Sequence, residues 1–150
     1  MNYMTAIIQL PLVKEAGAIK LKTPEDVSRL CSDMTNLAQE TFQVLCLDSK
    51  NNLVERCMAT LGISDASLVH PREVFRTAIE KNASAVLLVH NHPSGDPAPS
   101  AEDVRITKQL VEAGKIVDIK VLDHIIIGRR KKTEDLKHFI SMREEGVCKF

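Results

Sequence analysis

Two histidines, His90 and His92, lie one residue apart where the apolar run 85–89 ends. Successive side chains of a β-strand point to opposite faces, so both imidazoles share a face and can reach one ion. A loop rich in proline and glycine follows, and Asp103 then stands at the start of an expected helix. Two imidazoles and one carboxylate would leave one position of a tetrahedral zinc ion open for water, the usual plan of a hydrolytic zinc site.

Each part of this pattern also has a simpler interpretation. A His-x-His pair alone is more often a pair of surface or hydrogen-bonded histidines than a pair of ligands. Ser100 and Asp103 also fit a capping box at the start of a helix, and the glycine and prolines of 93–99 fit an ordinary loop. The combination of an apolar strand end, two imidazoles on one face, a stiff turn and an acid favours the metal site.

The same residues resemble a known signature. The order His90-x-His92, seven residues, Ser100, two residues, Asp103 is similar to that of the JAMM (MPN+) zinc metalloproteases, without gap or substitution. The segment HNHPSGDPAPS at 90–100 resembles one branch of that superfamily, the bacterial RadC family. Further RadC-like segments are FQVLCLD at 42–48, HPREVF at 70–75 and VLDHIIIG at 121–128. The similarity runs from about residue 40 to 127, and further towards 143.

The resemblance implies a zinc ion held by His90, His92 and Asp103. It also implies a general base, a glutamate at the start of an early strand. Glu40, immediately before the strand-like run 41–47, fits that position better than Glu55 on the returning strand, although spacing alone does not decide between them.

The resemblance further implies a zinc-dependent metallopeptidase or isopeptidase acting on a peptide or protein substrate. In the expected mechanism, zinc activates a water, Glu40 takes its proton, and hydroxide attacks an amide carbonyl. Ser100, besides capping its helix, would donate a hydrogen bond to the oxyanion. Glu40 would then return the proton to the leaving amine.

Other polar residues near the motif are expected to have structural rather than catalytic roles. Asn91 points to the face opposite the histidines and is expected to be structural. Asp96 is expected to brace the loop through an Asx-type turn. His124 is expected to be a hydrogen-bonded core or strand-edge histidine, with a supporting partner of the metal site as the alternative.

Hydrophobic patterning predicts the elements around the site. A Thr cap and Pro24 predict a helix start, and Ser100 predicts a helix to about Ala113 with Gly114 as its stop. The expected strands are 4–13, 42–47, 53–59, 85–89 and 120–127, the further helix is 71–82, and the tail from Glu134 is expected to be helical before an irregular end.

This order predicts a mixed α/β fold. The resemblance implies a mixed β-sheet flanked by helices in three layers, the JAMM/MPN (cytidine-deaminase-like) architecture. The length of 150 residues suits one domain. Residues 39–150 are expected to form the RadC-like domain, with a strand and helix in 1–38 packed on it or leading into it.

Composition limits the other function classes. The chain has 20 basic and 20 acidic residues and 3% aromatic residues, so neither a global field nor stacking side chains favour nucleic acid. We find no membrane span and no secretory signal, and the four scattered cysteines suit reduced thiols. A cytoplasmic protein is expected.

Two alternatives to the enzyme stay open. RadC proteins are traditionally labelled DNA repair proteins, but residues 1–38 are too short for the helix-hairpin-helix region that such proteins often carry. The basic turn 129–132 is the main candidate for phosphate contacts. The second alternative, a non-catalytic metal-binding interaction module, is disfavoured because every ligand of the motif is present. The sequence does not decide the oligomeric state, a homodimer included.

Overall fold

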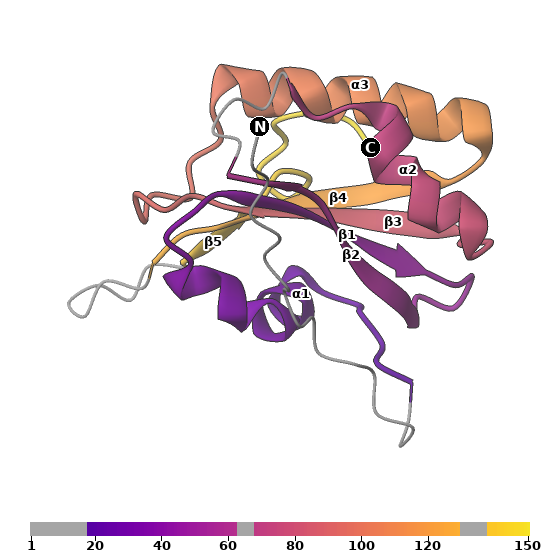
Figure 1. The fold of residues 1–150 in the computed structure, drawn as a ribbon, viewed down its shortest axis with the longest axis horizontal. Coiled ribbons are helices and arrows are strands. Elements are labelled where there is room, and N and C mark those ends of the chain that lie inside the picture. Colours follow the sequence, from indigo (N-terminus) through magenta and orange to yellow (C-terminus); the bar gives the residue numbers. More distant parts are fainter. Residues whose placement is uncertain (1–17, 63–67, 130–137) are drawn as a thin grey trace, which may run out of the picture.

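The computed structural model describes residues 18–62, 68–129 and 138–150. A five-stranded mixed sheet lies between two layers of helices (Figure 1). The elements in chain order are α1 (Pro24–Leu30), the 3-10 helix η1 (Ser32–Asn36), β1 (Thr41–Leu47), β2 (Leu53–Leu61), α2 (Pro71–Glu80), β3 (Ala85–Asn91), α3 (Ala101–Val117), β4 (Lys120–Ile127) and β5 (Phe139–Ser141). Within the described ranges, no helix combines the length and apolar character needed to cross a membrane.

The strand order β2-β1-β3-β4-β5 places β3 at the centre of the sheet. β3 pairs antiparallel with β1 and parallel with β4, and α3 is the crossover between the two parallel strands. Every residue of β3 is buried, as the run of apolar residues at 85–89 predicts for a central strand covered on both faces.

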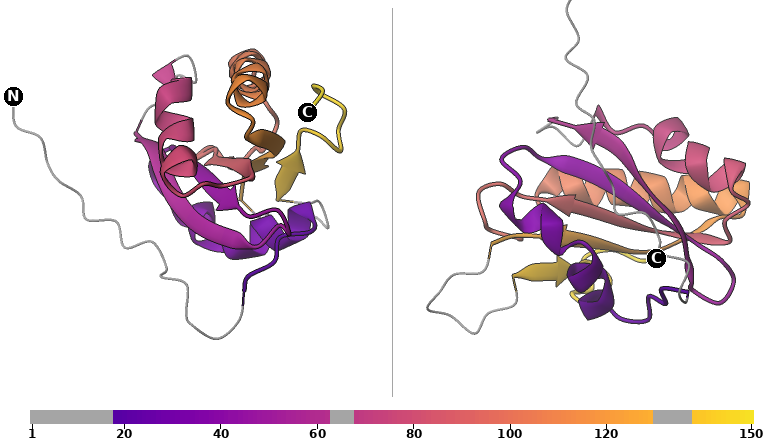
Figure 2. Two further views of the ribbon diagram at one scale, coloured as in Figure 1. Left: turned by 90° about the vertical axis from the view of Figure 1, so that its right-hand side faces the viewer. Right: turned by 60° about the horizontal axis from the view of Figure 1, so that its bottom comes forward.

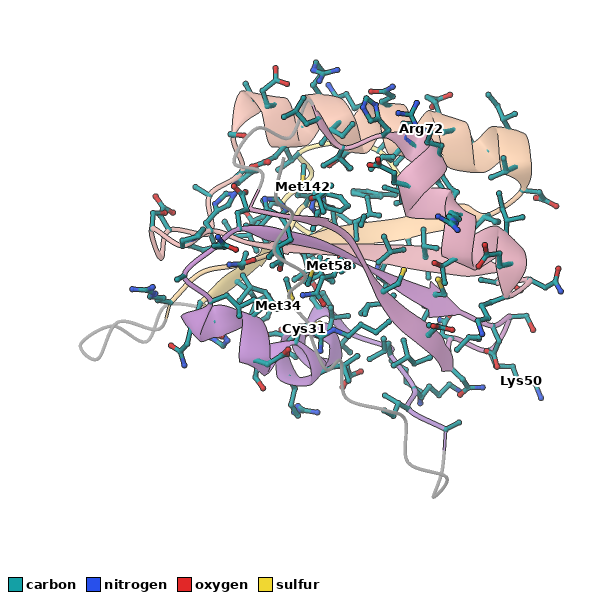
Figure 3. All side chains as sticks on the ribbon, viewed as in Figure 1. Cys31, Met34, Lys50, Met58, Arg72 and Met142 are labelled. Atoms are coloured by element: carbon teal, nitrogen blue, oxygen red, sulfur yellow. The ribbon has the colours of Figure 1, made fainter. Side chains whose placement is uncertain are left out.

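The alternation of side chains along the strands divides the apolar core in two. Val86 and Leu88 pack with the apolar residues of α2 and α3, whereas Leu87 and Val89 pack with those of α1 and η1. Figure 2 shows these helical layers on either side of the sheet. In Figure 3, the buried Cys31 and Met34 lie in the α1–η1 layer. The three-layer α/β architecture expected from the sequence is therefore confirmed.

Gly114 does not end α3, so that prediction was wrong. The helix continues through Gly114 to Val117 and ends at Asp118, whose φ of 57° is left-handed. A Cβ at position 114 would lie 2.5 Å from the carbonyl oxygen of Ile119. The glycine is needed because the chain entering β4 passes against the helix at this point, and it therefore serves packing rather than helix termination.

The C-terminal tail also differs from the prediction. Residues 138–150 form the short strand β5 followed by turns, with no helix in that stretch. β5 pairs with β4, and this ladder takes backbone groups that a helical tail would have used itself. The expected strand 4–13 and most of the basic turn 129–132 lie outside the described residues.

Candidate metal centre

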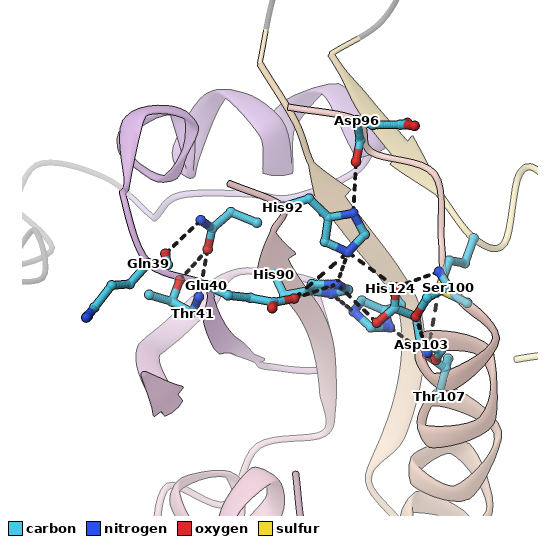
Figure 4. Close-up of polar contacts among 12 residues, drawn as sticks. Gln39, Glu40, Thr41, His90, His92, Asp96, Ser100, Asp103, Thr107 and His124 are labelled. Atoms are coloured by element: carbon cyan, nitrogen blue, oxygen red, sulfur yellow. Dashed lines mark hydrogen bonds and ion pairs between the residues drawn. The ribbon is translucent and has the colours of Figure 1, made fainter. Parts of the chain in front are cut away.

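The two histidines of the motif meet at the carboxyl end of β3. His90 is buried, and His92 follows directly after the strand with its side chain 16% exposed. Their Nε2 atoms lie 2.8 Å apart, so the i and i+2 positions share a face as the sequence predicts (Figure 4). His90 lies below the surface, whereas His92 is partly exposed. A group bound between the two imidazoles can therefore still be reached from solvent.

Asp103 reaches both imidazoles from the first turn of α3. Its Oδ1 lies 3.3 Å from Nε2 of His90, and its Oδ2 lies 3.3 Å from Nε2 of His92. The capping box expected at this helix start is present: Ser100 Oγ accepts from the Asp103 N–H, and Asp103 Oδ2 accepts from the Ser100 N–H. The cap fixes the rotamer of the carboxylate that faces the histidines.

Ser100 itself is exposed at the rim of the site. Its hydroxyl oxygen is engaged as the acceptor of the helix cap, which leaves the hydroxyl hydrogen free to point elsewhere. The capping role is confirmed, and the oxyanion role stays a prediction.

Glu40 approaches the histidines from the other side, immediately before β1 (Figure 4). Its Oε1 lies 3.8 Å from Nε2 of His90 and 3.9 Å from Nε2 of His92. Ligand atoms of these three residues all lie within 4.8 Å of one another. The structure thus brings together the four residues that the sequence singles out as ligands and base.

Glu55 lies elsewhere. Its backbone is opposite Cys46 in the β1–β2 ladder, while His90 is opposite Phe42 in the β1–β3 ladder. Four residues of strand separate those levels, or about 13 Å. The Glu55 carboxylate is paired with Lys81 at 3.1 Å, so the alternative base does not face the histidines.

The donor set fits a tetrahedral cation. Zinc–nitrogen bonds of about 2.0–2.1 Å place neighbouring tetrahedral ligands roughly 3.3–3.4 Å apart. Both contacts between Asp103 and the imidazoles are 3.3 Å long, whereas the two Nε2 atoms are closer, at 2.8 Å. Two imidazole lone pairs this close repel each other unless a cation or proton lies between them, so a cation would relieve the contact after a small opening of the pair.

The electrostatics of the site follow from burial and from Asp103. Burial lowers the pKa of His90, and the neighbouring Asp103 carboxylate offsets this only in part. Burial also opposes a charge on His92, but its bonds to Asp103 and to the Asp96 carbonyl outweigh burial and raise its pKa. Burial raises the pKa of Glu40, as suits a carboxylate that accepts protons.

Asp103 is held ionised. Burial alone would raise the pKa of its carboxyl, but the neighbouring imidazoles of His90 and His92 and the hydrogen bond from the Ser100 N–H outweigh that effect and hold the pKa well below the usual range. The helix N-terminus adds to this stabilisation of negative charge. The site therefore offers a permanent anionic oxygen beside two imidazole nitrogens.

The loop after β3 orients His92. Its Nδ1 lies 2.8 Å from the backbone oxygen of Asp96, and because a carbonyl only accepts, Nδ1 carries the hydrogen and Nε2 is left as the lone-pair donor. The Asp96 side chain accepts from the Ala98 N–H at 3.0 Å, which confirms the expected Asx-type turn.

Gly128 lets this loop pack down. A Cβ at position 128 would lie 2.3 Å from the Gly95 carbonyl oxygen and 2.9 Å from Cδ of Pro97. The Arg129 N–H donates to that same carbonyl at 2.9 Å, so the loop is tied to the end of β4.

A Gly128→Ala variant should therefore lose stability by about 1–3 kcal/mol, the usual cost of overpacking. It should also weaken metal binding at the candidate site, because the loop that holds His92 must move. Chemical denaturation and zinc titration measure the two effects. A Gly146→Ala variant is the matched control, since nothing lies within 4 Å of its Cβ. Its cost comes instead from the positive φ of 65° at Gly146, which Gly128 does not have, so it tests whether lost stability without a clash near His92 changes the affinity. Unchanged zinc affinity in Gly128→Ala would show that the loop does not orient His92.

Asn91, between the two histidines, supports Glu40 from the opposite face. Its Oδ1 accepts from the Thr41 N–H at 2.8 Å and from the Thr41 hydroxyl at 2.9 Å, and its Nδ2 donates to the Gln39 carbonyl at 3.0 Å. The amide thus holds the residues before and after Glu40. The structural role expected for Asn91 is confirmed, and it consists of fixing the backbone that carries Glu40.

A buried polar chain extends this support towards η1. Gln43 Nε2 donates to the Thr41 hydroxyl at 3.2 Å, and Gln43 Oε1 accepts from Nε of Arg56 at 2.6 Å. The Arg56 side chain is 3% exposed and paired with Asp33 at 2.8 Å. These hydrogen bonds could not be predicted from the sequence, because the residues that form them come from three separate segments and make no local motif.

His124 and Thr107 support His90 from within the core. Nδ1 of His90 lies 2.6 Å from Nε2 of His124, and Nδ1 of His124 lies 2.6 Å from the Thr107 hydroxyl. His124 is a buried, hydrogen-bonded histidine, as expected, and it also contacts a residue of the candidate site. Thr107 was not singled out from the sequence, although its position one helical turn after Asp103 places it on the same face of α3.

The comparisons with known proteins agree with this geometry. Residues 21–147 match the model of the RadC-like JAB domain. Similar curated relatives are UPF0758 proteins of Thermotoga maritima (48% identical over 127 residues, 85% of this chain and 54% of the relative), Caldanaerobacter subterraneus (46% over 143 residues, 95% and 58%) and Alkaliphilus metalliredigens (50% over 121 residues, 80% and 52%). The chain spans little more than half the length of these relatives. The protein described here belongs to the RadC family, as a RadC-like JAB domain.

Proposed function

We propose that this domain is a zinc-dependent hydrolase of amide bonds, acting on a peptide or isopeptide. The observation that carries the proposal is the convergence of Asp103 and Glu40 on the two Nε2 atoms of His90 and His92, at 3.3 Å and 3.8–3.9 Å. Three groups of the kind that zinc prefers and one further carboxylate are the elements of a catalytic rather than a structural zinc site.

His90, His92 and Asp103 would hold the ion. When bound, zinc supplies Lewis acidity, which lowers the pKa of a water and polarises a carbonyl oxygen. The His92 Nδ1–H donates to the Asp96 carbonyl, and the Asp103 carboxylate accepts from the Ser100 N–H of its helix cap, so both ligands keep their positions without zinc. The site is therefore preorganised for the ion.

Glu40 would serve as the general base. Its carboxylate lies farther from the imidazole nitrogens than that of Asp103, which suits a group that handles a proton rather than binds the ion. Partial burial raises its pKa and so strengthens it as a base. The Glu40 carboxylate would then deliver the proton that it took from the water to the leaving amine nitrogen. The Ser100 hydroxyl hydrogen would point at the developing oxyanion.

The test is to remove and restore the metal. Protein stripped with a chelator and returned to zinc should bind about one ion per chain and regain hydrolysis of a diverse mixture of peptides and lysine isopeptides. New amino termini, detected by mass spectrometry, measure the activity. Magnesium in place of zinc is the control, because a site with two imidazoles disfavours it. Failure to take up zinc would refute the proposal. Stoichiometric uptake without hydrolysis of any amide would instead identify a metal-binding interaction module.

A further inference from the structure

We infer that Thr107 and His124 form a hydrogen-bond relay that fixes His90 in the tautomer with its hydrogen on Nδ1, so that Nε2 of His90 is always a lone-pair donor to the site. Both are positioning residues, since neither contacts Glu40, His92 or an approaching substrate. The inference rests on the proposed function only in taking His90 as a metal ligand.

The relay has a fixed direction because it starts at a group that can only accept. The Thr107 hydroxyl lies 2.6 Å from the backbone oxygen of Asp103, and a carbonyl has no hydrogen to give. The single hydroxyl hydrogen must therefore point at that carbonyl, since two oxygens at this distance repel each other without a hydrogen between them. The hydroxyl oxygen is then left to accept.

The imidazole of His124 continues the same direction of hydrogen-bond donation. Its Nδ1, 2.6 Å from the Thr107 oxygen, must carry a hydrogen to make the bond. His124 is fully buried, and its two ring nitrogens face the Thr107 hydroxyl and the His90 ring rather than a carboxylate. A charged imidazolium without an acidic partner is costly in the core, so the ring is neutral and its Nε2 carries no second hydrogen. That Nε2 accepts from Nδ1 of His90 at 2.6 Å. His90 thus carries its hydrogen on Nδ1.

Other partners do not change this result. The Sδ of Met142 lies 3.7 Å from the Thr107 hydroxyl and is a weak acceptor. If the hydroxyl donated to that sulfur instead, its oxygen would still accept from His124 and the relay would keep its direction. Only donation from Thr107 to His124 would reverse it, and this would leave the Asp103 carbonyl facing an oxygen without a hydrogen.

The surroundings keep water out of the relay. Thr107 and His124 have no exposed surface, and the Phe42 ring stacks on His90 and meets His124 edge-on, with centroid distances of 5.8 and 5.3 Å. In a dry environment a mismatched donor or acceptor costs about 1–3 kcal/mol, so the tautomer is strongly selected.

Both imidazoles therefore take their orientation from one segment. His92 donates directly to the carbonyl of Asp96, and His90 donates through two intermediaries to the carbonyl of Asp103. The segment 96–103 thus supplies a ligand and sets the tautomers of the other two.

Nitrogen NMR of metal-free protein labelled with ¹⁵N-histidine tests the inference without substrate or zinc. We expect a protonated Nδ1 and a bare Nε2 for His90. Thr107→Val, which keeps the side-chain shape and removes the hydroxyl, should give a mixture of His90 tautomers and weaken zinc binding about 10- to 100-fold. Thr107→Ser should restore both properties. Ile106→Val, a neighbouring buried change on α3, is the control for simple loss of packing and should alter neither.

A wild-type His90 with its hydrogen on Nε2 would overturn the inference, and so would unchanged tautomer and zinc affinity in Thr107→Val. If Thr107→Val does not fold, the wild-type spectrum still decides the direction of the relay. Absence of amide hydrolysis would refute the proposed activity while leaving this result intact, so the two failures are distinguishable.

Discussion

Replacing Glu40 by glutamine is expected to abolish amide hydrolysis while leaving zinc bound. The amide keeps the size of the side chain but cannot take a proton, and general bases contribute about 10²- to 10⁴-fold to such reactions. Because Glu40 lies farther from the imidazoles than Asp103, the affinity for zinc should change little. The measurements are kcat/KM for a cleaved peptide and the zinc content of the same preparation.

Glu55→Gln is the matched control for that experiment. Glu55 belongs to the neighbouring strand β2 and pairs with Lys81, so its loss should leave hydrolysis within about twofold of the wild type. If Glu40→Gln remained as active as this control, the base would have to be another group, and the role given to Glu40 would be wrong.

Loss of a ligand should have the second large effect. His92→Ala and Asp103→Ala are each expected to reduce the zinc content from about one ion per chain to nearly none after dialysis against a weak chelator. Each substitution removes one of three donors, and removal of Asp103 also takes away the negative charge that offsets the charge of the ion. Metal analysis and competition with a chromophoric chelator measure the change.

Asp103 also closes the cap of α3, so a second variant must separate capping from ligation. Asp103→Asn keeps an oxygen that accepts from the Ser100 N–H and should therefore retain most of the stability, while its neutral amide is a poorer ligand. Glu102→Ala, a change at the preceding exposed acid, is the control and should bind zinc normally. Equal zinc content in Asp103→Ala and this control would exclude Asp103 as a ligand.

The parts of the site that could be predicted from the sequence are those set by local geometry. The shared face of His90 and His92 follows from strand periodicity, and the place of Asp103 follows from the cap at Ser100. The choice between Glu40 and Glu55 could not be made in this way, because it depends on the β1–β3 register, which pairs Phe42 with His90. No local pattern encodes that pairing.

The relay through Thr107 and His124 could not be predicted for the same reason. It requires α3 to pack on β4 so that Thr107 lies against His124. That position along the strand is set by the crossover from β3 to β4. The error at Gly114 has a related origin. A glycine near a helix end usually terminates the helix, but here a tertiary contact with the chain at Ile119 requires the missing side chain.

The amide of Asn91 has a consequence for how the centre responds to motion. At the end of the β1–β3 ladder, where strands fray most easily, a side chain from one strand takes the place of the next backbone pair and holds the peptide groups on both sides of Glu40. Displacement of the Glu40 backbone from the histidines therefore breaks three hydrogen bonds at once. The Thr41 amide hydrogen should consequently exchange with deuterated water only when this backbone segment opens.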